Sequence, residues 1–317
     1  MYLAFVTALR WTTPFYYGNV MLAQKMPLFK QNCGQYNTAI FGNSTVNRQF
    51  NPVTFDSLTE SSTHTFNLSS DGTPFEECAF ILENFLNDEC FENVKTVFLV
   101  VNHSQRLRDE NKNTYKIAYY HDLKRLQYNL AYRYDDPEDK RAHWDGFLEN
   151  MLGRFRFSRI IEMDQAYATR PLHGVSHRGF DPTSQMYGGF EKDASSMRPD
   201  QAEALLAYAK RTTSESQAIH RPFSKRDSVL YHSALNLKKE VESQGKVMHY
   251  IFLPNDPNYF RYKIPNSIYL GDGPEFPEFF EPTMRFNAAH LNDIGSEIYS
   301  ERIAQKYNEH LAHGGDF

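Results

Sequence analysis

The chain has 317 residues, of which 41% are hydrophobic, enough to bury a large core in one α/β domain or two smaller ones. Its formal net charge of -5 provides no basic field for a phosphate backbone, which excludes nucleic acid as an expected partner. The three cysteines, Cys33, Cys78 and Cys90, show neither CxxC nor Cys/His spacing. We therefore predict no metal site and no disulfide framework, while a single Cys78–Cys90 bridge stays open.

The N-terminal segment 1–30 opens with nine mainly apolar residues, MYLAFVTAL, before Arg10. This run is too short to span a bilayer, and no basic region precedes it. Two interpretations stay open: the remnant of an anchor, which would associate the protein with a membrane, or a segment packed on the domain. The first places the protein in the cell envelope, whereas the second also allows a cytoplasmic location.

Strands and helices are predicted to alternate along the chain. The short apolar run at 37–44 ends in a glycine-containing turn, and VKTVFLVVN at 94–102 is the clearest strand. Further strands are expected at 64–69, 246–253 and 267–270, and helices at 75–85, 227–244 and 295–311. This alternation predicts a three-layer α/β/α sandwich with a mainly parallel, five-stranded sheet, in which ligands gather at the carboxyl ends of the strands.

Residues 103–224 are predicted to form an insertion that is too long for a loop and too periodic for disorder. Helices are expected within it at 114–132, 143–154 and 200–211. We interpret this segment as a helical cap over the active edge of the sheet, embedded in a single domain that spans 1–317. Arg178, within the insertion, is a candidate for meeting an anionic group of a substrate.

Ser44 is the candidate nucleophile. It follows Gly42 and Asn43 at the carboxyl end of the first predicted strand, and a short helix is expected after it. The N-terminus of such a helix favours negative charge that develops at the serine. The Gly-x-Ser string is not specific by itself, because 174–176 also matches it, and a serine that only caps a helix is the alternative.

His290 is the candidate proton acceptor. It lies in the connection that precedes the C-terminal helix, where a histidine can face the edge of the sheet that carries Ser44. The alternative is a solvent-exposed or capping histidine, one of twelve in the chain.

In their order along the chain, these segments resemble the SGNH superfamily of serine hydrolases. The first block of that family ends a strand with Gly-x-Ser, as 42–44 does. Its last block has the form Asp-x-x-His-Leu-Asn-x-x-Gly, and residues 287–295, NAAHLNDIG, match it except at the first position. The glycine that the family places after the second strand matches Gly72, and the asparagine after the third matches Asn102.

The likeness covers about residues 37–102 and 225–311. Within the superfamily, the chain is most similar to the envelope branch that includes the D-alanine-transfer protein of teichoic-acid modification, in which an FNP-like stretch also follows the serine turn. Phe50-Asn51-Pro52 is that stretch here.

The resemblance implies a serine esterase or O-acyltransferase that acts on an acylated carbohydrate, expected to belong to the cell envelope. Ser44 would attack an ester carbonyl while His290 takes its proton, and the resulting acyl group would pass to water or to a sugar hydroxyl. The backbone N–H groups of Ser44 and Gly72 and the side chain of Asn102 would hold the oxyanion. No cofactor is required.

Asn287 departs from the family pattern, because it stands where an acidic residue is usual. An amide cannot stabilise an imidazolium by charge. Three interpretations are open: Asn287 or a main-chain carbonyl orients His290; a nearby acid, Asp293, Asp272 or Glu275, takes its place; or catalysis is lost and the protein has a carbohydrate-binding or assembly role. A cytoplasmic thioesterase or lipase-like enzyme is a further alternative, because the N-terminus does not establish export.

Overall fold

The computed structural model of this chain describes residues 1–12, 14–59, 62–101, 191–210, 225–253, 264–270 and 273–313, with a few positions between 152 and 183. The helices expected at 114–132 and 143–154 fall outside the described residues apart from isolated positions. The third helix expected within the insertion is present as α10, Pro199–Ala209.

Five parallel strands form one sheet in the order β2-β1-β3-β4-β5. They are Thr38–Phe41 (β1), Thr65–Asn67 (β2), Thr96–Val101 (β3), Val247–Phe252 (β4) and Ser267–Tyr269 (β5). Each lies inside a segment expected to be extended. The chain reverses direction across the sheet between β1 and β3, as in doubly wound folds, where ligands bind beyond the carboxyl ends of the strands at this switch point. Ser44 follows β1 at this position.

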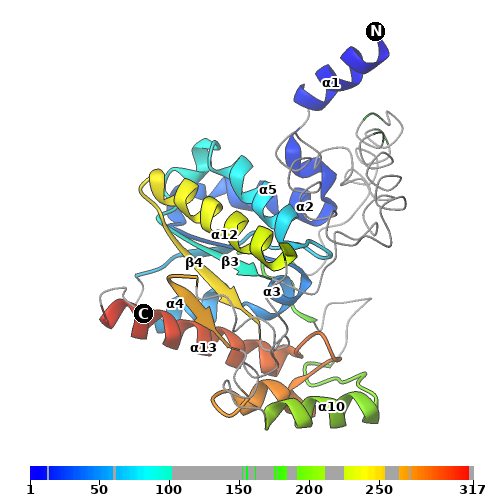
Figure 1. The fold of residues 1–317 in the computed structure, drawn as a ribbon, viewed down its shortest axis with the longest axis vertical. Coiled ribbons are helices and arrows are strands. Elements are labelled where there is room, and N and C mark those ends of the chain that lie inside the picture. Colours follow the sequence, from blue (N-terminus) through cyan, green and yellow to red (C-terminus); the bar gives the residue numbers. More distant parts are fainter. Residues whose placement is uncertain are drawn as a thin grey trace.

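Helices cover both faces of the sheet (Figure 1). On one side lie α2 (Val20–Gln31), α5 (Phe75–Phe85) and α12 (Lys225–Ser243), and on the other lie α3 (Ser44–Gln49), α4 (Pro52–Leu58) and α13 (Asp293–Ala312). Short 3-10 turns connect them at Phe15–Gly18, Cys33–Gln35, Glu89–Phe91, Pro277–Phe280 and Pro282–Met284.

The strands supply both halves of the core in alternation. Ala39 and Phe41 pack against the helices of the first side, whereas Ile40 packs against those of the second. Because successive side chains of a strand point to opposite faces, a strand buried on both faces appears in the sequence as a continuous apolar run. The predicted three-layer α/β/α sandwich is confirmed.

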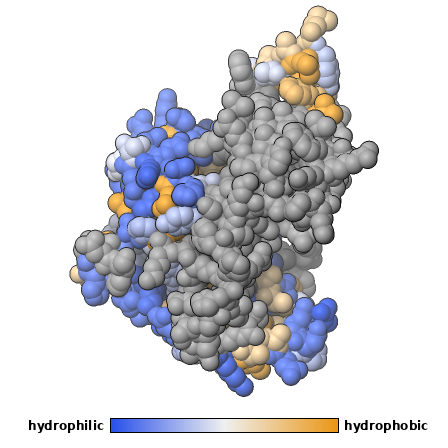
Figure 2. All heavy atoms as spheres, viewed as in Figure 1, coloured by the Kyte–Doolittle hydropathy of each residue, from blue (hydrophilic) through white to orange (hydrophobic). Residues whose placement is uncertain are grey.

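The N-terminal segment contains two helices of different character. In α2, Leu22, Met26 and Phe29 are buried against the sheet. The first helix, α1 (Tyr2–Thr12), lies at one end of the molecule, where Val6 is buried and the Tyr2 hydroxyl donates to the carbonyl of Phe155 at 2.9 Å (Figure 1). Its exposed side chains include Tyr2, Leu3 and Phe5, which form a hydrophobic patch (Figure 2). Within the described ranges, no helix combines the length and the apolar character needed to cross a bilayer.

One disulfide joins Cys33 to Cys90, with their Cα atoms 5.2 Å apart, within the usual range for such a bond. Cys78, in α5, is buried and takes no part in this bond. The Cys78–Cys90 bridge left open by the sequence is therefore wrong. Cys33 lies two residues after the end of α2, and the folded chain brings it beside the turn Glu89–Phe91 that precedes β3. The spacing of the cysteines alone could not indicate this.

We expect loss of this disulfide to lower the free energy of unfolding by about 4 kcal/mol, because the bond closes a long loop in the unfolded chain. The two cysteines are 57 residues apart. Urea unfolding of the parent and of a Cys33→Ser/Cys90→Ser variant, each with and without reductant, measures the effect. Reductant should destabilise the parent alone; a reductant effect of equal size in both proteins would contradict the assignment.

Candidate active site

A tight turn after β1 places Ser44 at the first position of α3. The side chain of Asn43 caps the helix by accepting a hydrogen bond from the backbone N–H of Thr45 at 3.0 Å. Gly42 leaves room for the helix, because a Cβ atom there would lie 2.6 Å from a methyl group of Val46. The Gly-Asn-Ser sequence therefore builds the turn, and Ser44 stays only partly buried.

The loop that carries His290 is held from both sides. The buried guanidinium of Arg285 donates hydrogen bonds to the carbonyl of Phe279 at 2.7 Å and to that of Ala288 at 2.9 Å. The backbone N–H of Asn287 donates to the carbonyl of His290 at 3.2 Å. These contacts hold the loop in place independently of Ser44.

The start of α13 fixes the other end of this loop. Asn292 caps the helix by accepting from the backbone N–H of Gly295 at 3.0 Å. A Cβ atom on Gly295 would lie 2.3 Å from the carbonyl oxygen of Met284, so only glycine fits there. The Asn and Gly of the predicted C-terminal block therefore have local structural roles.

A chain of hydrogen bonds joins Asn287, His290 and Ser44. The Nε2 atom of His290 lies 3.0 Å from Ser44 Oγ, and its Nδ1 atom lies 3.1 Å from Asn287 Oδ1. The backbone N–H groups of Ala289 and His290 also donate to this Asn287 atom, at 2.8 and 2.9 Å, so it must be the acceptor oxygen. Nδ1 of His290 is then the donor, and in a neutral ring Nε2 accepts the Ser44 hydroxyl proton.

Asn287 is thus placed on His290 as the first of the three interpretations expects. Of the alternative acids, Glu275 pairs with Lys306 at 2.5 Å, and Asp293 lies in the first turn of α13. Asp272 lies outside the described residues. The side-chain amide oxygen orients the imidazole without supplying a negative charge.

Gly72 lies in a turn that is anchored on α3. Its φ of 61° is in the left-handed region that favours glycine. The preceding residue, Asp71, accepts hydrogen bonds from Asn47 Nδ2 at 3.0 Å and from Arg48 at 2.6 Å. The turn expected to supply an oxyanion donor is therefore attached to the helix that begins at Ser44. Asn102, the other expected donor, lies outside the described residues.

Buried charges support this arrangement. Arg48 lies between two carboxylates, 2.6 Å from Asp71 and 3.1 Å from Asp181. Lys25 of α2 donates to Asn47 Oδ1 at 2.6 Å and to two backbone carbonyls, and burial lowers its pKa to about 7 despite the opposing effect of Asp181 and Asp71. The role of these residues was not predicted from the sequence. Only Arg48 had a signal, because it lies one helical turn after Ser44.

The surroundings of His290 keep its ring neutral. Burial and the positive charge of Arg48 lower its pKa to about 4, with a smaller contribution from Arg285, and Asp71 acts in the opposite direction. A neutral imidazole is the form that accepts a proton. The same shift shows that an imidazolium, once formed, is poorly stabilised here.

We expect an NMR titration of the His290 ring to have a midpoint near pH 4 instead of the usual 6.5, with a His290→Gln spectrum for assignment. The unfolded chain then binds more protons than the folded one between these pH values, so this group lowers stability as the pH falls through that window. A midpoint near 6.5 would contradict the burial of this ring.

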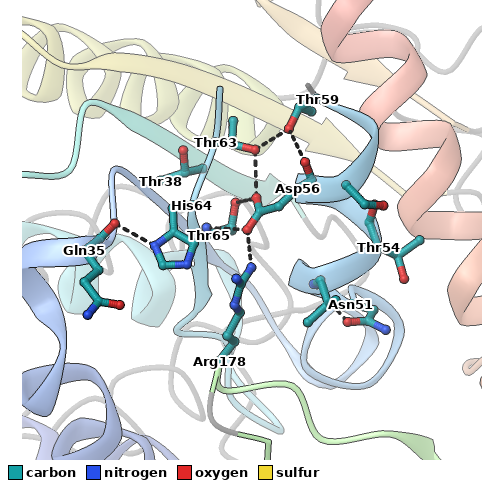
Figure 3. A network of polar contacts seen from close by, with 12 residues as sticks. Gln35, Thr38, Asn51, Thr54, Asp56, Thr59, Thr63, His64, Thr65 and Arg178 are labelled. Atoms are coloured by element: carbon teal, nitrogen blue, oxygen red, sulfur yellow. Dashed lines mark hydrogen bonds and ion pairs between the residues drawn. The ribbon is translucent and has the colours of Figure 1, made fainter. Parts of the chain in front are cut away.

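Arg178 has a different position from the one expected of a substrate-binding residue. Its guanidinium lies 2.5 Å from the buried carboxylate of Asp56 in α4 (Figure 3). Asp56 also accepts hydrogen bonds from the Thr63 hydroxyl at 2.7 Å and from the backbone and hydroxyl of Thr65 at 2.8 and 2.6 Å. The suggestion that Arg178 meets a substrate anion is therefore corrected, because its charge is paired inside the protein.

No protein-family model, curated protein or solved structure matches this chain. Within the described part of the chain, no group of three or more His, Cys, Asp or Glu side chains is placed to hold a metal ion.

Proposed function

We propose that this protein is a serine esterase or O-acyltransferase of SGNH type that acts on an acylated carbohydrate. The observation that carries the proposal is the hydrogen-bonded chain from Asn287 through His290 to Ser44. Nucleophile, base and orienting group are the three parts that an activated serine needs. Ser44 begins α3 directly after β1, whereas Asn287 and His290 lie on the loop before α13.

In the proposed reaction, Ser44 Oγ attacks the ester carbonyl and its proton passes to Nε2 of His290. The tetrahedral intermediate then collapses, and His290 returns the proton to the departing alcohol, which leaves an acyl group on Ser44. Water or a sugar hydroxyl next attacks this acyl group, and its proton passes to His290. The bond between the acyl carbon and Ser44 Oγ then breaks, and His290 returns the proton to Ser44. Water gives hydrolysis, and a sugar hydroxyl gives transfer. The N–H of Gly72 is a proposed donor to the oxyanion in both halves.

The proposed substrate and location have separate support. The carbohydrate class comes from the resemblance to the envelope branch of the superfamily, which is an argument by analogy. The Cys33–Cys90 disulfide supports an oxidising compartment, because such bonds are rare in the cytosol. An extracytoplasmic position in the cell envelope agrees with both.

A second candidate function is a binding or assembly protein that keeps the fold without turnover. Two observations favour it: Asn287 supplies no charge, and the pKa of His290 is lowered to about 4. A base this weak accepts the serine proton with little driving force.

Labelling with a fluorophosphonate probe separates the two candidates, because the probe modifies only an activated serine. We expect the purified parent to be labelled at Ser44, and Ser44→Ala and His290→Ala to be unlabelled. Ser57→Ala, at an exposed serine of α4, is the matched control and should behave as the parent does.

Labelled parent protein would then be tested for release of acyl groups from acylated sugars and for their transfer to an added sugar acceptor. No labelling of the parent, under conditions that label a control esterase, would reject the enzymatic proposal and favour the binding role.

A further inference from the structure

A short segment of the insertion lies against both halves of the candidate site. We call this segment the strap; its described residues are Ser176 and 178–183. A tight turn opens it, in which the backbone N–H of Ser176 donates to the carbonyl of Phe180 at 2.7 Å and Gly179 has a φ of 77°. The turn lets the chain approach the sheet closely.

The strap is attached to the outer edge of the sheet. The carbonyl of Arg178 accepts a hydrogen bond from the backbone N–H of Asn67 in β2 at 2.9 Å, and its side chain pairs with Asp56 (Figure 3). A Cβ atom on Gly179 would lie 2.3 Å from the carbonyl oxygen of Asn67, so glycine is needed for this approach. Backbone, ion pair and steric fit therefore all fix the first part of the strap.

The second part of the strap reaches the elements that carry the serine and the histidine. The backbone N–H of Asp181 donates to the carbonyl of Asn47 at 3.2 Å, and its carboxylate lies 3.1 Å from Arg48, both in α3. Two residues later, the hydroxyl of Thr183 donates to the carbonyl of Leu291 at 2.9 Å, next to His290. Asp181 and Thr183 are both buried.

We propose that Asp181 is a positioning residue for the Ser44 site and acts through Arg48. This inference rests on the proposed function. Arg48 extends from the helix that starts at Ser44 and holds Asp71 with its other nitrogen, beside Gly72. The carboxylate of Asp181 fixes the guanidinium from the opposite side. Asp181 thereby holds the helix that begins at Ser44 and, through Arg48, the turn that carries Gly72, while Thr183 of the same strap holds the histidine loop.

Loss of the Asp181 charge leaves Arg48 buried with one carboxylate instead of two. A guanidinium that is no longer held on this side can turn away from its ideal contact with Asp71, and the Gly72 turn can shift with it. A misplacement of about 1 Å in a catalytic group can lower a rate by about 100-fold. The effect is expected on the chemical step, because neither Asp181 nor Arg48 is proposed to touch the substrate.

The test compares rates of fluorophosphonate labelling at Ser44. We expect Asp181→Asn to label about 10- to 100-fold more slowly than the parent, and Asp181→Glu to recover part of the loss. With an activated acyl ester, kcat should fall by a similar factor while KM changes by less than about twofold. The matched control is Asp200→Asn, an exposed carboxylate of the same insertion, which should label at the parent rate.

Thr183→Val provides a second test, because it is nearly the same size and removes only the hydrogen bond to Leu291. It should slow labelling through the histidine loop. If Asp181→Asn does not fold, Asp181→Glu decides the role of Asp181, because it keeps the charge but lengthens the side chain by one methylene; a labelling rate equal to that of the parent would then contradict the positioning role. Folded variants at both positions that label at the parent rate would overturn the positioning role and leave the proposed function intact. A parent that is not labelled would instead reject the proposed function.

Discussion

Replacing His290 with alanine is expected to lower the turnover of an activated acyl ester by about 10⁴- to 10⁶-fold, with the folded state retained. In serine hydrolases, loss of the base alone removes most of the catalysis that the serine and histidine provide together. His290 is only partly buried and lies on a loop, so its side chain contributes little to the core. Thermal unfolding and steady-state kinetics of the same preparations measure both effects.

The effects of Ser44→Ala and His290→Ala should not add. Because the two residues act as one unit, the double variant is expected to be about as inactive as either single variant. Additive losses would contradict the proposed proton transfer from Ser44 to His290 and would indicate that the two residues act independently. His232→Ala, in α12, provides a matched control for the loss of a histidine.

The fold was largely predictable because its strands are short, apolar and buried on both faces. Residues 94–102 showed this most clearly, and β3 occupies most of that segment. The exact ends were not predictable, because the flanking residues Lys95 and Asn37 enter the sheet only through isolated backbone hydrogen bonds. The disulfide was misassigned for a related reason. Only the packing of α2 on the sheet brings Cys33 near Cys90.

The Ser44–His290 pair was predicted from the order of two motifs along the chain, because neither motif is specific by itself. Gly42 and Gly295 mark close approaches that no other residue permits, and these fix the turns on either side of the Ser44–His290 contact. The support around the pair was not predictable. Lys25 and Asp181 reach α3 from segments far away in the chain, and nothing in their local sequence distinguishes them from ordinary surface charges.

The contact between Asn287 and His290 explains how this site differs electrostatically from a triad with an acid. The asparagine oxygen accepts three hydrogen bonds and so holds both the loop and the ring in place. Orientation is therefore complete, but the charge that would stabilise an imidazolium is missing. Arg48 and Arg285 add positive charge nearby, which disfavours the imidazolium further.

Asn287→Asp is therefore expected to increase the activity. An ionised carboxylate in contact with a histidine raises the pKa of the histidine by about 1–3 units. The pKa of His290 would then lie closer to neutral pH, where a general base works best. The three donors already present on the asparagine oxygen favour the ionised form of the new side chain. We expect labelling at Ser44 to become about 10- to 1,000-fold faster, below the roughly 10⁴-fold effect of the corresponding change in the serine-protease template.

Asn87→Asp, on the exposed turn after α5, makes the same chemical change away from the site and should leave the rate unchanged. An NMR titration of the His290 ring should show the higher pKa in Asn287→Asp alone. If the pKa rises and labelling does not become faster, the missing charge does not limit this site, and the oxyanion donors become the limiting part. If the parent is unlabelled and Asn287→Asp is labelled, the parent favours the binding role. A single carboxylate is then sufficient to activate Ser44, which shows that the other parts of the site are functional.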